Sequence, residues 1–246
     1  MNAELRIIST DGCTTDVQSV SRSEKQLEAH RLFDHESGIR PIVDLHMAAF
    51  PGFFLTSLGP RFLRLLYTGF VHQPCGICIA AEENGEIVGF AAGTTAPDVF
   101  FGRLLRKQGW RFALAAIPGL LRNPGIVVRK CLGAVLYRGE EPVGLTNVAL
   151  LSSLAVSPER GGQGIGHQLV HAFALEARRQ GCSAIYLTTD EADNDRVNRF
   201  YAKCGFVLRD TFRRPGERVM NRWVMEVRRQ HPLERTLAYC GGQQAV

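Results

Sequence analysis

A glycine-rich turn is the part of the sequence best suited to bind a ligand. Residues 157–166 read Ser-Pro-Glu-Arg-Gly-Gly-Gln-Gly-Ile-Gly, between an expected strand at 146–156 and an expected helix at 164–180. Glycines let the chain fold back so that successive backbone N–H groups point into one concavity. The N-terminus of a helix adds further N–H groups and a dipole that favours an anion. The turn therefore predicts a phosphate site, and a pyrophosphate is its natural occupant.

Two better-known phosphate loops do not fit this turn. A Walker A loop ends in Gly-Lys-Ser or Gly-Lys-Thr, and the sequence contains no Gly-Lys pair. The dinucleotide-binding pattern Gly-x-Gly-x-x-Gly could start at Gly162, but His167 stands where its last glycine should be. Two alternatives stay open at this point: a nucleotide-binding module of another kind, and a glycine-rich linker without a ligand.

Three motifs in a fixed order resemble the GNAT superfamily of N-acetyltransferases. Residues 154–170 are similar to its coenzyme-A-binding motif, Gln/Arg-x-x-Gly-x-Gly/Ala, with Gly164 and Gly166 at the last two positions. Residues 194–206 resemble its segment Asn-x-x-Ala-x-x-Phe-Tyr-x-x-x-Gly-Phe, and residues 86–90 resemble the strand of its second hairpin. The resemblance extends over residues 28–227 except for an insert at 98–140, and it implies an acyltransferase with acetyl-CoA as co-substrate and no metal.

The resemblance also implies roles for single residues. The pantetheine arm would pair like a strand with residues 154–156, and the N–H of Leu154 would donate to the thioester oxygen. Tyr201 would be the general acid, because a phenol is protonated at neutral pH and can give its proton to a departing thiolate. Simpler alternatives are a sheet bond for Leu154, a core position for Tyr201 and a helix cap for Asn194. The implied cofactor-binding residues are Leu154, Ala155, Val156, Arg160, Gly161, Gly162, Gln163, Gly164, Ile165, Gly166, Asn194 and Tyr201.

The general base is left open by the sequence. Some family members carry a glutamate midway along the strand before the phosphate turn, and Leu150 stands at the matching position here. The remaining candidates are His46, Asp190, Glu191, Glu82 and Glu83. An amine that is already partly neutral could also lose its proton to bulk water.

Hydrophobic periodicity and turn residues predict the elements that hold these motifs. Helices are expected at 41–49, 62–70, 99–108, 110–121, 164–180 and 194–204, and strands at 5–9, 28–33, 76–81, 87–95, 146–156, 184–189, 206–211 and 218–227. The fold class that the resemblance implies is α/β (α+β). Its central sheet is mixed, mostly antiparallel and flanked by helices, with a helical insert between the third and fourth strands.

The chain is expected to hold one acyl-CoA N-acyltransferase domain at 27–227, between a flexible N-terminal tail at 1–26 and a C-terminal tail at 228–246. Within the insert, residues 99–139 contain eight basic residues and no acidic residue. The insert could clamp a phosphorylated acceptor such as a nucleotide-linked amino sugar, or meet anionic lipid or a lipid-linked sugar. It could also be an ordinary solvated face.

Composition sets the limits of the function. The 246 residues are 45% hydrophobic and 22% charged, which is typical of a globular domain, and the net charge of +5 suits a phosphate-bearing ligand better than nucleic acid. The seven cysteines are an odd number and are expected to be reduced thiols. Cys75 and Cys78 have CxxC spacing without the further ligands that zinc needs. The first residues lack the layout of a signal peptide, and no apolar run reaches the roughly 20 residues of a membrane span.

The sequence therefore predicts a cytoplasmic N-acetyltransferase, monomeric or homodimeric, that acts on a primary amine of a small molecule. A nucleotide- or lipid-linked amino sugar is one such acceptor, and a peripheral membrane contact through 98–140 is included in the prediction. The alternatives are a non-catalytic acyl-CoA-binding sensor and an enzyme that acetylates a protein or peptide amine.

Overall fold

The computed structural model describes residues 4–8, 38–122, 144–213 and 218–227. These form one seven-stranded sheet in the order β1-β2-β3-β4-β5-β7-β6, in which only β4 and β5 are parallel neighbours. The strands are β1 (Glu4–Ile8), β2 (Gly76–Glu83), β3 (Glu86–Thr94), β4 (Val148–Val156), β5 (Ala184–Asp190), β6 (Val207–Arg213) and β7 (Val219–Glu226). The predicted mixed, mostly antiparallel sheet is confirmed.

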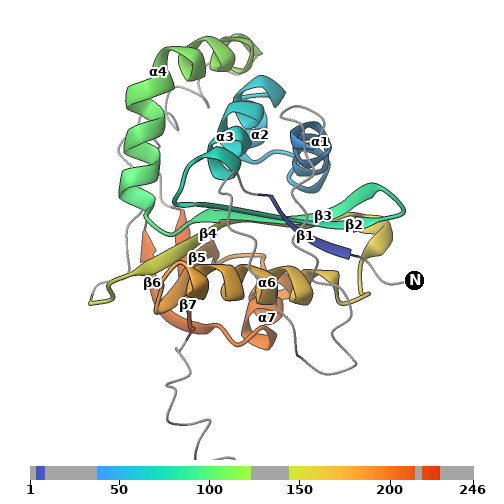
Figure 1. Ribbon diagram of the computed structural model, residues 1–246, viewed down its shortest axis with the longest axis vertical. Helices are drawn as coiled ribbons and strands as arrows, with labels where there is room; N and C mark the ends of the chain where they lie inside the picture. The colour runs from blue at the N-terminus through green and yellow to red at the C-terminus, as the bar shows by residue number, and fades with distance from the viewer. Residues whose placement is uncertain (1–3, 9–37, 123–143, 214–217, 228–246) are drawn as a thin grey trace, which may run out of the picture.

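Helices cover both faces of the sheet (Figure 1). One face carries α1 (Ile39–Ala49), α2 (Phe54–Ser57), α3 (Pro60–His72) and α4 (Pro97–Arg122), and the other carries α6 (Ile165–Arg179) and α7 (Asp195–Lys203). A single 3-10 turn, η1 (Pro158–Arg160), follows β4. Because helices lie on both sides, the inner strands β2, β3, β4 and β5 are mostly apolar on both faces, whereas the edge strand β6 is exposed.

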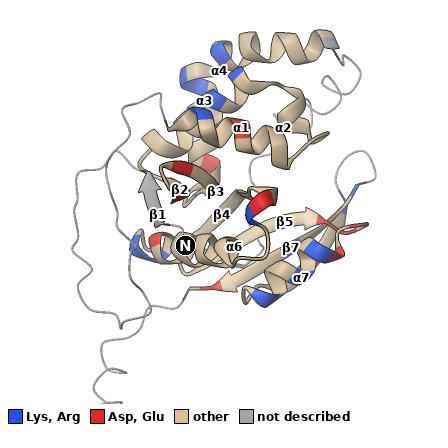
Figure 2. Ribbon diagram, turned by 90° about the vertical axis from the view of Figure 1, so that its right-hand side faces the viewer, with Lys and Arg blue, Asp and Glu red and all other residues tan. Residues whose placement is uncertain are grey.

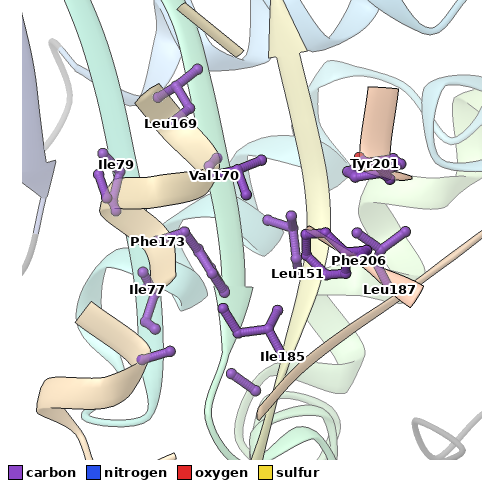
Figure 3. Packing of buried hydrophobic residues seen from close by; sticks show 14 of the residues in the cluster. Ile77, Ile79, Leu151, Leu169, Val170, Phe173, Ile185, Leu187, Tyr201 and Phe206 are labelled. Carbon is purple, nitrogen blue, oxygen red and sulfur yellow. The ribbon is translucent and has the colours of Figure 1, made fainter. Parts of the chain in front are cut away.

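The strand β2 shows how the alternation of side chains serves two cores. Ile77 and Ile79 point toward α6, where they pack with Leu169 and Phe173 (Figure 3). Cys78 points the other way, into a second core on the side of α1, α3 and α4. The continuous apolar run of β2 therefore reflects burial on both faces.

The helix α4 differs from the prediction of two pieces, because it runs unbroken through Gly109 and Pro118. Its buried face carries Phe100 and Phe112, whose rings lie 4.6 Å from Phe70 and 4.9 Å from Phe62 of α3. Burial of such rings stabilises more than the roughly 1 kcal/mol that an interior glycine costs. Its position between β3 and β4 confirms the predicted insert between the third and fourth strands.

Other boundaries differ in smaller ways. The strand expected at 5–9 is β1, which pairs with β2, so residues 4–8 belong to the sheet. The helix expected from Pro41 begins at Ile39. A proline is compatible with this place in the first turn, because the first four N–H groups of a helix have no partner within it and the N–H that proline lacks is not needed there. The short α2 was not predicted. The strand expected at 28–33, the rest of the tail at 1–26, the second half of the insert and the tail at 228–246 lie outside the described residues.

Candidate active site

The strands β4 and β5 separate partway along their length. In the described part of the chain their pairing covers only Val148–Leu150 of β4 against Ala184–Tyr186 of β5. Beyond Leu150, β4 continues for six residues paired on its other side with β3 alone. At the same point Ser152 is an extra residue in the β3–β4 register, and a bulge of this kind bends a strand. The sheet therefore opens into a gap beside residues 151–156.

Two backbone N–H groups of β4 point into this gap. The N–H of Ser157 donates to the carbonyl of Val88 on β3 at 2.8 Å. Because N–H groups along a strand alternate in direction, Ala155 also faces β3, whereas Leu154 and Val156 face away from it. Their side chains pack against the core under α6. The N–H of Leu154 is therefore directed away from β3, and its role as a donor to the thioester stays a prediction.

The glycine-rich turn provides an open concavity at the start of α6. Gly162 and Gly164 have φ of 81° and 82°, and a side chain at either position would meet nothing within 4 Å. Gly164 is the N-cap of α6, and the first turn of this helix holds no acidic residue. Since the N–H groups of a first helical turn lack acceptors within the helix, they are available to an anion.

Gly166 has a different role from the glycines before it. It lies in the first turn of α6, where an added Cβ would come within 3.1 Å of the Phe200 ring of α7. The ring of His167 also lies 5.0 Å from that of Phe200. Gly166 therefore lets α6 approach α7 closely, which brings the phosphate turn next to the helix that carries Tyr201.

Arg160 makes a contact that the sequence did not indicate. Its Nε lies 2.7 Å from Oε2 of Glu83, and the side chains are 35% and 5% exposed respectively. The approach is an ion contact without the angles of a hydrogen bond. Glu83 ends β2, so the pair joins the glycine-rich turn after β4 to the end of β2.

Tyr201 lies on α7 beside the open part of β4. Its ring packs against Phe200 and Phe206 at 5.1 and 5.6 Å, and Figure 3 shows it near Leu187 of β5. Burial, and to a lesser extent the neighbouring Cys204, raise the pKa of Tyr201 above the ordinary value of a phenol. The hydroxyl is therefore protonated throughout the neutral range, as a general acid must be.

Asn194 occupies the N-cap of α7, but its side chain does not cap the helix within the described part of the chain. Its amide instead donates to the carbonyl oxygen of Asp190 at 3.4 Å. Asp193 has φ of 54° and lies before the helix. The helix is held to β5 by Asn198, whose Oδ1 accepts a hydrogen bond from Thr189 at 2.7 Å.

The candidate bases differ in their surroundings. Leu150, at the position of the family glutamate, is buried and apolar. Glu83 is paired with Arg160, and Asp190 accepts a two-point hydrogen bond from Arg218. Glu191 is exposed after β5, and Glu82 is half-buried at the hairpin. Glu83 and Asp190 therefore each already hold a cation of the protein itself.

The remaining candidate, His46, is part of a buried polar set. Its Nδ1 lies 2.6 Å from the hydroxyl of Tyr67, which also hydrogen-bonds to Ser153 of β4. Burial lowers the pKa of His46 to about 4 and raises that of Tyr67. His46 is therefore neutral but weakly basic, and the set joins α1, α3 and the open half of β4.

The two cysteines with CxxC spacing lie at the start of β2. Cys78 is buried in β2 and Cys75 is half-buried at its entrance. Burial raises the pKa of Cys78 to about 12 and that of Cys204 to about 11, so both thiols are un-ionised at neutral pH. Within the described ranges, no group of three or more histidine, cysteine, aspartate or glutamate residues could hold a metal ion.

Comparisons with known proteins agree with this geometry. The acetyltransferase (GNAT) family matches residues 39–206. No curated protein matches the chain in sequence. An aminoglycoside 6'-acetyltransferase type Ii shares the fold with a TM-score of 0.51 and 17% identity, over 81% of this chain and 97% of that one. An aminoglycoside 6'-N-acetyltransferase complexed with coenzyme A has a TM-score of 0.47 and 16% identity, over 78% of this chain and 91% of that one. The ribosomal-protein-S18-alanine N-acetyltransferase of Escherichia coli has a TM-score of 0.46 and 13% identity, over 78% of this chain and 90% of that one.

The chain belongs to the acetyltransferase (GNAT) family, because the family match extends over more than half of its length. It is an acyltransferase, and the predicted enzyme class and acetyl-CoA as co-substrate are confirmed by this membership. Of the helices that the structure describes, none has both the length and the apolar character needed to cross a membrane.

Proposed function

We propose that this enzyme transfers the acetyl group of acetyl-CoA to a primary amine of a small molecule. The observation that carries the proposal is the gap beyond Leu150, where β4 separates from β5 next to Tyr201. Within the described residues, the gap has strand N–H groups without a strand partner beside it and the glycine-rich turn at its end, which suits the chemistry of an acyl-CoA.

The cofactor would lie along β4. The pantetheine arm pairs with the edge at Leu154, Ala155 and Val156, as a further strand would. The pyrophosphate rests in the turn formed by Gly161, Gly162, Gln163, Gly164, Ile165 and Gly166. Arg160 keeps about a third of its side chain exposed, so its terminal nitrogens can reach a phosphate while Nε faces Glu83. Asn194 borders the cofactor at the end of β5.

The chemistry needs two groups of the chain. The N–H of Leu154 donates to the thioester oxygen and stabilises the negative charge that develops there. The amine nitrogen attacks the carbonyl carbon, the carbon–sulfur bond breaks, and the thiolate takes the proton of the Tyr201 hydroxyl. The attacking nitrogen releases its remaining extra proton to water, and the phenolate regains a proton from water, so that the products are an amide and coenzyme A with a free thiol.

The amine must be neutral before it attacks. Leu150 replaces the carboxylate that some relatives carry, and His46 is a weak base at its lowered pKa. We propose that solvent water takes the proton of the ammonium, so that only the neutral fraction of the acceptor reacts. This predicts a rate that rises with pH until the acceptor amine itself is titrated.

The outward face of α4 supports an acceptor carried at a membrane surface, such as a lipid-linked amino sugar. Trp110 and Leu121 are 67% and 78% exposed, and Leu114 and Ile117 extend the same stripe. Figure 2 shows basic residues on the N-terminal half of α4, which the sequence identifies as Arg103, Arg106, Lys107 and Arg111. Basic and apolar side chains on one exposed helix are typical of contact with anionic lipid. Release from anionic vesicles as salt rises would test this contact.

We also propose the limits of the domain and its compartment. Residues 27–227 form the catalytic domain, with β1 added to its sheet from the preceding segment. The four cysteines that the structure describes as free thiols support a cytoplasmic enzyme.

A panel of primary amines tests the proposed function. Each amine is mixed with acetyl-CoA and the enzyme, and free thiol is measured over time against a sample without amine. The proposal requires at least one small-molecule amine to increase thiol release. If coenzyme A raises the melting temperature but no amine increases thiol release, the chain is an acyl-CoA-binding sensor.

A further inference from the structure

Asp190 is the last residue of β5 and lies beside the gap between β4 and β5. Continuing the β4–β5 register beyond Leu150 and Tyr186 brings Asp190 level with the segment at Leu154. Side chains alternate along β5, so Asp190 shares a face with Tyr186, which packs under α4. Thr189 points to the other face, toward α7. Asp190 therefore stands on the face opposite α6 and the phosphate turn.

The carboxylate of Asp190 already holds a cation. Nε and Nη2 of Arg218, just before β7, each donate to one of its oxygens. The guanidinium carbon also lies 5.9 Å from the ring centre of Phe53, at the turn between α1 and α2. The side chains of Asp190 and Arg218 are 25% and 45% exposed, and Phe53 is 47% exposed. A carboxylate and an aromatic face thus meet around one accessible positive charge.

Phe53 is held in this position by a series of aromatic contacts. Its ring lies 5.4 Å from that of Phe50, which lies 4.8 Å from the buried His46. The hydroxyl of Thr56 donates to the carbonyl of Phe50 at 2.7 Å and fixes the turn. The exposed ring of Phe53 therefore faces a cation, the guanidinium of Arg218.

We propose that Asp190 and Phe53 form a binding site for an ammonium group of the acceptor, which Arg218 occupies in the free enzyme. This proposal rests on the proposed function. A carboxylate offers a charge-assisted hydrogen bond and an aromatic face attracts a cation, so both recognise an ammonium as they recognise the guanidinium. The acceptor would displace Arg218, whose exposed side chain can turn outward into solvent.

The alternative is that Arg218 is only a strap that joins β7 to β5. Removal of Arg218 has a different effect in each case. If Arg218 only joins β7 to β5, it contributes to folding and no ligand binds at Asp190 after its removal. If Arg218 occupies a ligand site, it competes with the ligand for the carboxylate of Asp190. In the second case, removal of Arg218 must strengthen the binding of a cation.

Calorimetry with 1,3-diaminopropane as the probe, on the full chain saturated with coenzyme A, separates these cases. We expect Arg218→Ala to bind the diamine at least about fivefold more tightly than the wild type. Asp190→Asn should weaken binding about tenfold, which is typical of losing one charge-assisted hydrogen bond. Phe53→Leu should weaken it roughly threefold, the size of an exposed cation–π contact. The uncharged 1,3-propanediol should bind to none of them.

Arg196→Ala is the matched control, since Arg196 is an exposed arginine on α7 and its removal should leave diamine binding unchanged. The proposal is overturned if Arg218→Ala binds the diamine no more tightly than wild type, or if neither protein binds it. Should Asp190→Asn fail to fold, the diamine affinities of Phe53→Leu and Arg218→Ala decide whether the proposed ammonium site exists. Binding is measured without turnover, so a failure of thiol release in the amine panel would contradict the proposed function and leave this result standing.

Discussion

Nε of Arg160 lies 2.7 Å from Oε2 of Glu83, and this ion pair joins the phosphate turn to the end of β2. Arg160→Gln leaves a carboxylate with 5% exposure without its cation. We expect the free energy of unfolding to fall by roughly 2 kcal/mol, less than for a fully buried pair because Arg160 is partly solvated. The KM for acetyl-CoA should rise, since the turn loses its link to the sheet. Urea unfolding and initial-rate kinetics measure the two effects.

The double variant Arg160→Gln with Glu83→Gln is the control for this pair. It removes the buried charge together with its partner, so part of the lost stability should return. Equal stability of the single and double variants would mean that the ion pair contributes nothing.

Tyr201→Phe removes one hydroxyl and keeps the ring among Phe200 and Phe206. We expect kcat to fall by about 10²-fold, the usual effect of removing a positioned acid, with little change in the Kd of acetyl-CoA. Because burial raises the pKa of Tyr201, ionisation of this group should not reduce kcat below about pH 10. A wild-type kcat in the variant, with chemistry shown to limit the rate, would make Tyr201 a core residue only.

The local parts of this site could be predicted from the sequence, and the long-range parts could not. The glycines at 161–166 and the segment at Tyr201 are each contiguous in the sequence, so their resemblance to the motifs of the GNAT family could be recognised without a structure. Arg160 meets Glu83 from a distant part of the chain, and only the folded sheet brings the two together. The same holds for Arg218 and Asp190. In α4, Gly109 separated the two helices expected at 99–108 and 110–121, but packing against α3 overrides this local preference.

His46 should make the stability of the protein depend on pH. Its pKa falls from 6.5 to about 4 on burial, so between these values the unfolded chain binds a proton that the folded chain does not. Stability therefore rises as pH rises through this window, and is lost as pH falls through it. From pH 6.5 to pH 5 we expect a loss of about 1.5 kcal/mol. His46→Gln should reduce this slope in urea unfolding, and an identical slope would exclude His46 as its source.

Gly164→Asp should abolish the rise in melting temperature that acetyl-CoA produces. The substitution places bulk and negative charge in the turn at φ of 82°, where glycine leaves the space open. Gly144→Asp is the matched control, because Gly144 has φ of 81° and also has open space around it, before β4. Both variants carry similar backbone strain, so a loss of the ligand effect in both would point to strain and not to the phosphate site.

The most direct test of cofactor binding in the gap is amide hydrogen exchange along β4, with and without acetyl-CoA. Leu154 and Val156 face the gap, so their amides should exchange readily in the free protein and become at least about tenfold slower when the pantetheine arm pairs with them. The amide of Ala155, which faces β3, serves as the internal reference and should be protected in both states. If acetyl-CoA raises the melting temperature while exchange at Leu154 and Val156 is unchanged, the cofactor does not bind along β4 and the proposed mechanism is wrong.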